Sequence, residues 1–208
     1  MIRVLLADDH NLVREGLKQL LAATADIRVE GEAADGDQAL AKAKANAYDL
    51  AVLDMSMPGL SGIELIKRLR AEKPRLRLLV LSMHGEEQYA VRALKAGASG
   101  YLTKDSASAQ LVGAIRKVAG GGMHISEAAA AQLVGAGTAG DALPHSRLSN
   151  REFEVFRLLV AGEGPTGIAA RLHLSVKTVS THKTRILEKM EMESTADLVR
   201  YAVENKLS

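Results

Sequence analysis

The chain has 208 residues, of which 47% are hydrophobic and 25% charged, and its formal net charge is +2. This length suits two modest globular domains. The lack of cysteine excludes a disulfide framework, and no apolar stretch reaches the roughly 20 residues needed to cross a bilayer. The start, MIRVLLADDH, turns acidic too early for a signal peptide. We therefore expect a cytoplasmic protein that does not enter a membrane.

Residues 1–120 alternate between strand-like and helix-like segments five times. The first, third and fourth strand-like runs are almost continuously apolar, which is typical of a central parallel sheet covered on both faces. The pattern predicts an α/β doubly wound (βα)5 domain. Its strands are expected at 2–7, 27–33, 49–53, 76–82 and 99–102.

Three acids stand where the predicted strands end. Asp8 and Asp9 follow the first strand and Asp54 follows the third. The carboxyl ends of parallel strands line the ligand crevice of such a fold, and carboxylates are ligands that Mg²⁺ prefers. We therefore expect a Mg²⁺ site made by these acids and the backbone carbonyl of Ser56. Each acid also has a purely structural explanation. Asp8 and Asp9 can cap the following helix, and Asp54 can simply be a polar residue at the end of a strand.

The same edge of the sheet carries groups suited to a phosphoryl group. An aspartate such as Asp54 can act as a nucleophile toward phosphorus and form an acyl phosphate. Lys104, after the fifth strand, would neutralise part of the anionic charge, and the Ser82 hydroxyl could hydrogen-bond a phosphoryl oxygen. A lone lysine is more often exposed to solvent, so the prediction depends on all of these groups occurring together.

The rest of the chain is divided into a linker and a helical domain. Residues 121–146 are rich in small and turn-forming residues and predict a flexible linker, with one short helix that Ser126 can cap. From residue 147 to 208 the pattern is entirely helical, beginning with the capping box Ser149-x-x-Glu152. A short helix near 168–174 followed by a basic helix over 176–190 predicts a helix-turn-helix, and a last helix begins near 194.

The basic helix has a distinct apolar side and a distinct polar side. Its predicted buried stripe is Val179, Ile186, Leu187 and Met190. Hydroxyls and threonine methyls on the other side can meet base edges, while lysine and arginine meet phosphates. Without further information, a surface for docking another protein is an equally good interpretation of this helix. The residues predicted to face DNA are Lys177, Thr178, Ser180, Thr181, Lys183, Thr184 and Arg185.

The strings LLADDH, VLDMSMPGLSGIEL, VLSMH and ALKAGASGYLTKD resemble the receiver domain of two-component systems over residues 1–120. This resemblance implies that Asp54 is the phospho-acceptor, that Asp8 and Asp9 surround Mg²⁺, and that Lys104 contacts the phosphate. It also implies that Ser82 and Tyr101 are the hydroxyl and aromatic switch residues. A histidine kinase would then be the partner that phosphorylates the protein.

Residues 147–208, with LSNREFEV, IAARLHLSVKTVSTHKTRILEKM and ADLVRYA, resemble the LuxR-type helix-turn-helix of NarL/FixJ response regulators. The resemblance implies promoter DNA as a partner, with Ser180, Thr181 and Thr184 facing bases. It implies a homodimer when the protein is phosphorylated or bound to DNA. Leu198, Tyr201 and Ala202 on the last helix could supply the pairing surface, although packing in the core is the simpler interpretation of these residues. The residues implied to contact the DNA backbone or lie near the groove are Lys177, Thr178, His182, Lys183 and Arg185, and His182 is equally well explained as a packed helix residue.

Two departures from the family pattern, and two rival functions, remain. Asp105 follows Lys104 where many receivers have proline, and EGPTGIAA (163–170) replaces a polar run. We expect Thr166 to cap the short helix, and Gly167 to cost up to about 1 kcal/mol and to lack a phosphate contact, so that DNA binding is weaker. An Asp-nucleophile phosphohydrolase would need a second acid where Ser56 stands. A transcription factor that acts without phosphorylation is the other alternative.

Overall fold

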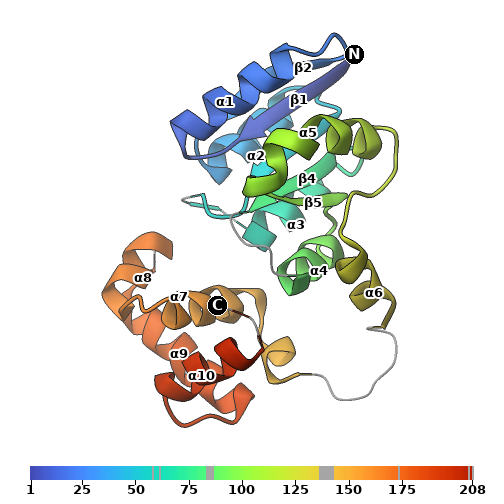
Figure 1. The fold of residues 1–208 in the computed structure, drawn as a ribbon. Helices are drawn as coiled ribbons and strands as arrows, with labels where there is room; N and C mark the ends of the chain where they lie inside the picture. Colours follow the sequence, from blue (N-terminus) through green and yellow to red (C-terminus); the bar gives the residue numbers. More distant parts are fainter. Residues whose placement is uncertain are drawn as a thin grey trace. The chain divides into compact units, whose positions relative to one another are not determined.

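The computed structural model describes residues 1–57, 59–60, 62–82, 87–135, 143–172, 174–205 and 207. The chain forms two compact units, Met1–Gly135 and Ala136–Ser208. Figure 1 shows strands only in the first of these, whereas the second consists of helices. The boundary between the two units lies within residues 121–146, the stretch expected from the sequence to be a linker.

The first unit is built on a parallel five-stranded sheet. Its strands are β1 (Ile2–Ala7), β2 (Ile27–Ala33), β3 (Leu50–Asp54), β4 (Arg77–Ser82) and β5 (Gly100–Thr103), in the order β2-β1-β3-β4-β5. They alternate with α1 (Asn11–Ala22), α2 (Gly36–Ala45), α3 (Gly62–Glu72), α4 (Glu87–Lys95) and α5 (Lys104–Ala119). The predicted doubly wound (βα)5 fold is therefore confirmed.

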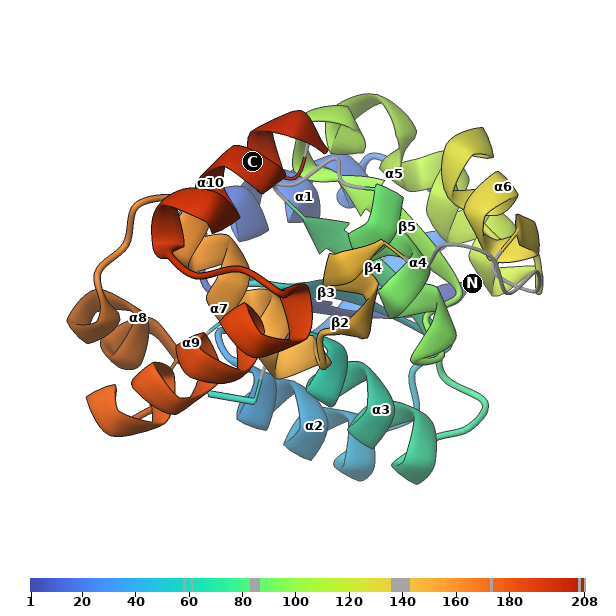
Figure 2. The ribbon, with the colours of Figure 1, turned by 90° about the horizontal axis from the view of Figure 1, so that it is seen from below.

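The helices cover both faces of the sheet. α1 lies against α5, while α2 contacts α3 and α3 contacts α4, and Figure 2 shows α1 and α5 on the side of the sheet opposite α2 and α3. All five residues of β3 are buried, as expected for a central strand covered on both faces. The strands β3, β4 and β5 each begin one residue later than predicted. β3 and β5 also end one residue later, because pairing with β4 includes Asp54 and Thr103.

The segment after α5 adds to the first unit. The backbone N–H of Tyr101 donates to the carbonyl of His124 at 2.8 Å, and that of His124 donates to Ser99 at 3.3 Å, so this segment runs beside β5. The expected short helix is α6 (Glu127–Gly135), and the Ser126 hydroxyl accepts a hydrogen bond from the backbone of Ala129 at its start. α6 packs against α4. The rest of the expected tether falls largely on residues 136–142, which lie outside the described residues.

The second unit consists of the short 3-10 helix η1 (Pro144–Arg147) and the helices α7 (Asn150–Val160), α8 (Pro165–Leu172), α9 (Val176–Met190) and α10 (Thr195–Glu204). The capping box of Ser149 and Glu152 forms at the start of α7 as predicted. α9 packs against both α7 and α8, and α10 packs against α7. Phe153 and Phe156 stack in the core. α8 and α9 are the two helices of the predicted helix-turn-helix.

Two expectations for this unit are wrong in detail, and one open alternative is settled. α8 begins at Pro165, so Thr166 lies inside the first turn and does not cap the helix. Proline is tolerated there because the N–H of a first-turn residue has no partner within the helix. Leu187 is only half-buried, beside the buried Ile186. For Leu198 and Ala202 the alternative of core packing is confirmed, because both are fully buried where α10 packs against α7.

Candidate functional site

The predicted acids meet at the carboxyl edge of the sheet. β1 and β3 are neighbours, which brings Asp8 and Asp54 together, and both side chains are almost completely buried. β4 ends at Ser82 beside β3, and α5 begins with Lys104 directly after β5. Thr103 caps α5 through a hydrogen bond from the Ser106 backbone, and this fixes the point at which Lys104 leaves the sheet. Four residues distant in sequence thus share one edge.

Lys104 forms ion pairs with both buried acids. Its Nζ lies 2.7 Å from Oδ2 of Asp8 and 2.8 Å from Oδ2 of Asp54. Burial lowers the pKa of Lys104, but its hydrogen bonds to Asp54 and Asp8 outweigh this effect and the pKa lies above the usual value. The ammonium group therefore stays charged near neutral pH and faces both carboxylates.

The cluster carries more negative charge than Lys104 can balance. Single ligand atoms of Asp8, Asp9, His10 and Asp54 all lie within 4.8 Å of one another. Burial raises the pKa of Asp54, and the charge of Asp8 adds to this, against the opposing effect of Lys104. Such a carboxylate-rich donor set fits a divalent cation, which would offset the excess charge. The alternative in which Asp8 or Asp9 caps α1 is wrong, because His10 occupies the cap position and no side chain caps the helix.

The remaining predicted residues of the first unit lie around Asp54. The Ser56 backbone N–H donates to Oδ1 of Asp54 at 3.2 Å. Ser82 is fully buried and Tyr101 nearly so. Val80 pairs with Tyr101 across the sheet, and alternate residues of a strand share a face, so Ser82 and Tyr101 lie on the same face. The two predicted switch residues are therefore positioned on one side of the sheet at the edge that holds Asp54.

The predicted DNA-binding residues lie along α9. Val179, Ile186 and Met190 face the core. Thr178, His182 and Lys183 are half-buried, and Thr178 accepts or donates a hydrogen bond with the capping residue Ser175 at 2.8 Å. The residues of the set that are exposed are Lys177, Ser180, Thr181, Thr184 and Arg185.

The exposed hydroxyls of α9 are held by the helix itself. Those of Ser180, Thr181 and Thr184 each donate to the backbone carbonyl four residues earlier, at 3.0, 3.0 and 3.2 Å. Their oxygen lone pairs and the threonine methyl groups stay directed outward, available to base edges. The protons of these hydroxyls are therefore already used by the helix, whereas their oxygen atoms can still accept hydrogen bonds from a partner.

The basic residues of the helix-turn-helix divide into two groups. Lys189 pairs with the buried Glu152 of α7 at 2.6 Å, and Arg171 pairs with Glu163 at 2.5 Å. Among the described residues, Lys177, Lys183 and Arg185 form no ion pair. Burial, with the nearby charge of Arg151, lowers the pKa of His182, so this ring is neutral at pH 7. The positive charge of α9 that can meet a phosphate thus lies in Lys177, Lys183 and Arg185.

Two family models match the chain. The model of the response regulator receiver domain matches residues 4–116, and the model of the bacterial regulatory proteins of the luxR family matches residues 146–202. The response regulator UvrY of Escherichia coli is 34% identical over 209 residues, covering 100% of this chain and 96% of UvrY.

This chain is a two-component response regulator of the NarL/FixJ family. Two solved structures are similar over almost all of it. RcsB of Salmonella enterica serovar Typhimurium, bound to promoter rprA in the presence of the phosphomimetic BeF3-, has a TM-score of 0.69 and 28% identity, covering 96% of this chain and 97% of that one. A structure of two RcsB dimers bound to two parallel DNAs has a TM-score of 0.60 and 28% identity, with 97% and 98% covered. The response regulator described here therefore combines a receiver with a LuxR-type DNA-binding domain.

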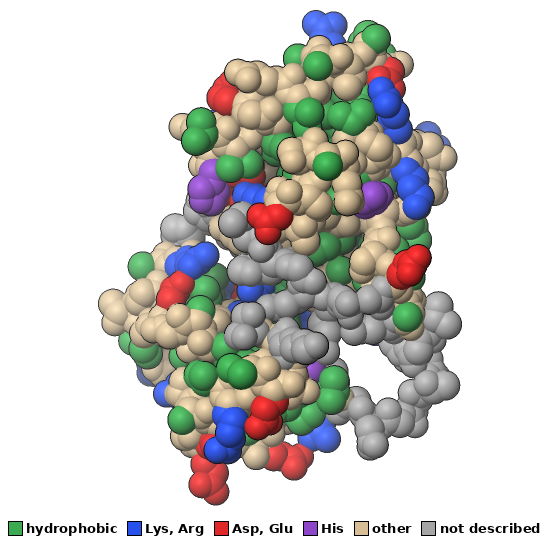
Figure 3. All heavy atoms as spheres, viewed as in Figure 1, with side chains coloured by type: hydrophobic (Ala, Val, Ile, Leu, Met, Phe, Trp, Pro, Cys, Tyr) green, Lys and Arg blue, Asp and Glu red, His purple; other side chains and the backbone are tan. Residues whose placement is uncertain are grey.

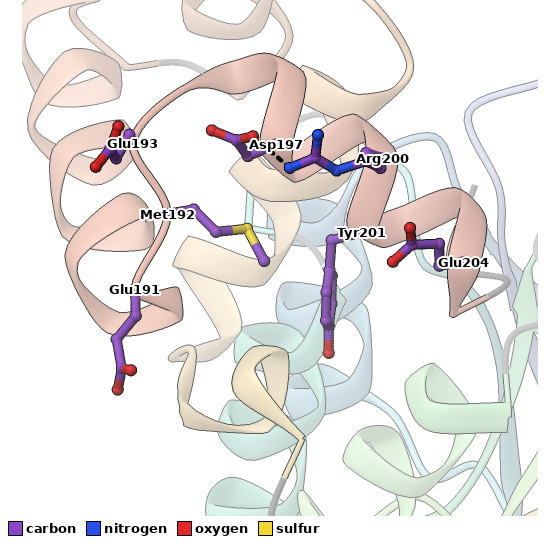
Figure 4. Close-up of a pocket in the computed structure, with 7 residues that line it drawn as sticks. All are labelled: Glu191, Met192, Glu193, Asp197, Arg200, Tyr201 and Glu204. Atoms are coloured by element: carbon purple, nitrogen blue, oxygen red, sulfur yellow. Dashed lines mark hydrogen bonds and ion pairs between the residues drawn. The ribbon is translucent and has the colours of Figure 1, made fainter.

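A pocket of about 380 Å³ in the second unit of this response regulator is unsuited to DNA phosphates. It lies between the end of α9 and α10, and Figure 4 shows its residues around a hollow in which Arg200 is paired with Asp197. The acidic side chains that line the pocket would repel phosphates. Elsewhere on the face seen in Figure 3, basic and acidic side chains are mixed. The residues that line it are Glu191, Met192, Glu193, Asp197, Arg200, Tyr201 and Glu204.

One residue of the acidic cluster was missed by the sequence reasoning. His10 directly follows the acidic pair and its ring reaches Asp9, Asp8 and Asp54. The signal available in the sequence was its position between Asp9 and the first helix, but a lone histidine there is most simply interpreted as exposed.

No helix among the described residues has the length and apolar character required to cross a membrane.

Proposed function

We propose that Asp54 accepts a phosphoryl group from a sensor histidine kinase, and that this controls DNA binding by α9. The observation that carries the proposal is the buried Asp54 carboxylate, with Oδ2 held 2.8 Å from Lys104 and Asp8 beside it. In the transfer, a carboxylate oxygen of Asp54 attacks phosphorus and the bond between phosphorus and the donor breaks, leaving an acyl phosphate. Lys104 would then contact the phosphoryl oxygens.

Mg²⁺ would be held by Asp8, Asp9, Asp54 and the backbone carbonyl of Ser56, and would supply charge neutralisation for the incoming group. The excess of carboxylates over ammonium in the cluster supports this assignment. Ser82 and Tyr101 would act as the switch. The Ser82 hydroxyl would hydrogen-bond the phosphoryl group, and the aromatic ring would change position on the same face of the sheet. Apart from slow self-dephosphorylation we expect no catalysis.

The exposed face of α9 would read promoter DNA as part of a homodimer in the cytoplasm. Ser180, Thr181 and Thr184 would meet base edges, while Lys177, Lys183 and Arg185 would meet phosphates. Thr178 and His182 would lie near the groove. The similarity to RcsB, whose structures include dimers on DNA, supports this arrangement.

The test is phosphorylation of the full chain by acetyl phosphate with Mg²⁺. Intact-mass measurement should show the gain of one phosphoryl group, absent in Asp54→Asn and absent when the metal is chelated. Binding to promoter DNA should then tighten in the presence of beryllofluoride and Mg²⁺. A chain that binds DNA equally with and without the phosphomimetic would favour the alternative of a transcription factor that acts without phosphorylation.

A further inference from the structure

His10 lies on the solvent side of the acidic cluster, and hydrogen bonds hold both its backbone N–H and its carbonyl. Its N–H donates to Oδ1 of Asp8 at 2.8 Å, and its carbonyl accepts from the backbone of Arg14 at 3.0 Å. The Arg14 guanidinium in turn donates to the Asp8 carbonyl at 2.6 Å. The backbone therefore leaves the His10 ring little freedom other than rotation about its own side-chain bonds.

The ring nitrogen is close to every carboxylate of the cluster. Nδ1 of His10 lies 2.9 Å from Oδ1 of Asp9, 3.3 Å from Oδ1 of Asp8 and 3.9 Å from Oδ2 of Asp54. Two ligand atoms each about 2.1 Å from one octahedral ion are about 3.0 Å apart when adjacent and about 4.2 Å apart when opposite. All three separations fall in this interval or at its edge. Ligand atoms of all four residues lie within 4.8 Å of one another, so small movements of the side chains would allow the imidazole and the three acids to share one ion.

The position of the ring also suits an entering ion. The His10 side chain is 60% exposed, whereas those of Asp8 and Asp54 are 1% exposed. An ion that comes from solvent toward the buried carboxylates would therefore meet His10 and Asp9 first. The nitrogen is not needed to hold Mg²⁺, which prefers oxygen ligands, whereas Mn²⁺, Co²⁺, Ni²⁺ and Zn²⁺ accept imidazole readily.

We propose that His10 determines the metal specificity of this pocket, by adding a nitrogen ligand to Asp8, Asp9 and Asp54. The pocket then binds a transition-metal ion such as Ni²⁺ more tightly, relative to Mg²⁺, than the carboxylates alone would. Such ions compete with Mg²⁺ for the same oxygens. The inference rests on the proposed function of this site, because it assumes that the cluster is a metal pocket.

The rival explanation is that His10 only donates its Nδ1 proton to Asp9 and turns into solvent when an ion enters. In that case replacing the ring would change the binding of all divalent ions to a similar extent. The two explanations therefore differ in the ratio of two affinities and in whether nitrogen is bound to the metal.

The experiment compares wild type, His10→Asn and His124→Asn as full chains. Asparagine keeps a polar side chain at the cap position of α1, where it is favoured, and His124 is a histidine of the same unit beside β5. Calorimetric titration with Ni²⁺ alone and Mg²⁺ alone gives the ratio of affinities. We expect it to fall by about tenfold or more in His10→Asn and to stay within about threefold in His124→Asn. Retained Mg²⁺ binding checks that the pocket is folded.

Pulsed electron paramagnetic resonance with Mn²⁺ alone provides the second readout. Wild type should show a signal from metal-bound nitrogen that Mg²⁺ displaces and that His10→Asn lacks. The proposal is overturned if the affinity ratio is unchanged in His10→Asn, or if wild type lacks the nitrogen signal, or if the variant keeps it. Phosphorylation of wild type by acetyl phosphate with Mg²⁺ is measured in parallel. A mass gain at Asp54 without a nitrogen signal would refute the role of His10 and leave the proposed function intact.

Discussion

Gly167 lies in the first turn of α8, where the family pattern usually has a charged side chain. A Cβ at this position would approach only Oε2 of Glu163, at 3.8 Å, so the structure has room for a larger residue. Glycine within a helix costs up to about 1 kcal/mol relative to alanine. Packing therefore does not explain why glycine stands at position 167, and the effect of a larger side chain can be tested directly.

We predict that Gly167→Lys increases affinity for promoter DNA. The added ammonium would meet a phosphate, because the start of the first helix of a helix-turn-helix crosses the DNA backbone. The slope of log affinity against log salt should steepen by about 1 unit, measured by fluorescence anisotropy over a salt series. Gly167→Gln is the matched control, with a similar length and no charge. A slope equal in both variants would place residue 167 away from the DNA.

At the level of elements, β5 makes a close contact with the segment after α5. A Cβ on Gly100 would lie 2.9 Å from Cδ1 of Leu79 and 3.0 Å from the carbonyl of His124. The end of the Leu79 side chain would have to move, and the His124 carbonyl, which belongs to the backbone that pairs with Tyr101, would have to shift slightly. Close packing therefore favours glycine at position 100.

We predict that Gly100→Ala lowers the free energy of unfolding by about 1–3 kcal/mol, as overpacking of a core does. The loss should appear in residues 122–135 as faster amide hydrogen exchange, because the segment leading to α6 must shift. Gly113→Ala in α5 is the control, since nothing lies within 4 Å of its Cβ position, and it should be neutral or stabilising. Equal exchange in the two variants would show that the segment does not depend on β5.

For the whole molecule, dimer formation is expected to involve the exposed face of α10, because the opposite face packs in the core. Leu198 and Ala202 are in the core. The Tyr201 hydroxyl is hydrogen-bonded to Nδ1 of His145 at 2.6 Å. Val199 and Val203 are exposed, at 36% and 62%, and lie four residues apart on one side of the helix. This apolar pair is the better candidate for contact between two copies.

Val203→Glu should therefore weaken dimeric binding to DNA that carries two half-sites, while the domain still folds and binds a single half-site. The charge would be placed in an apolar contact between copies, at a cost of several kcal/mol to association. Analytical ultracentrifugation with each DNA measures this. Glu204→Gln, at the adjacent residue, is the control and should leave the dimer unchanged. If Val203→Glu dimerises like wild type, α10 does not form the contact.

The sequence by itself was sufficient for the α/β fold, the helix-turn-helix and the set of acids around Asp54. Strand alternation and helix periodicity are local, and the carboxyl ends of parallel strands must meet at one edge, so Asp8, Asp54 and Lys104 were brought together by topology alone. The capping box at Ser149 was readable for the same reason, since its hydrogen bonds span three residues.

Only the tertiary structure decided the remaining points. Periodicity marks Leu198 and Ala202 as apolar but does not say whether a neighbouring helix or a second copy covers them. The pairing of His124 with Tyr101 joins residues from two elements, and no local pattern records it. The closeness of His10 to Asp54, at 3.9 Å, depends on how β1 and β3 are registered and where α1 begins. Contacts between separate elements are set by packing in three dimensions, whereas sequence patterns report the period of a single element.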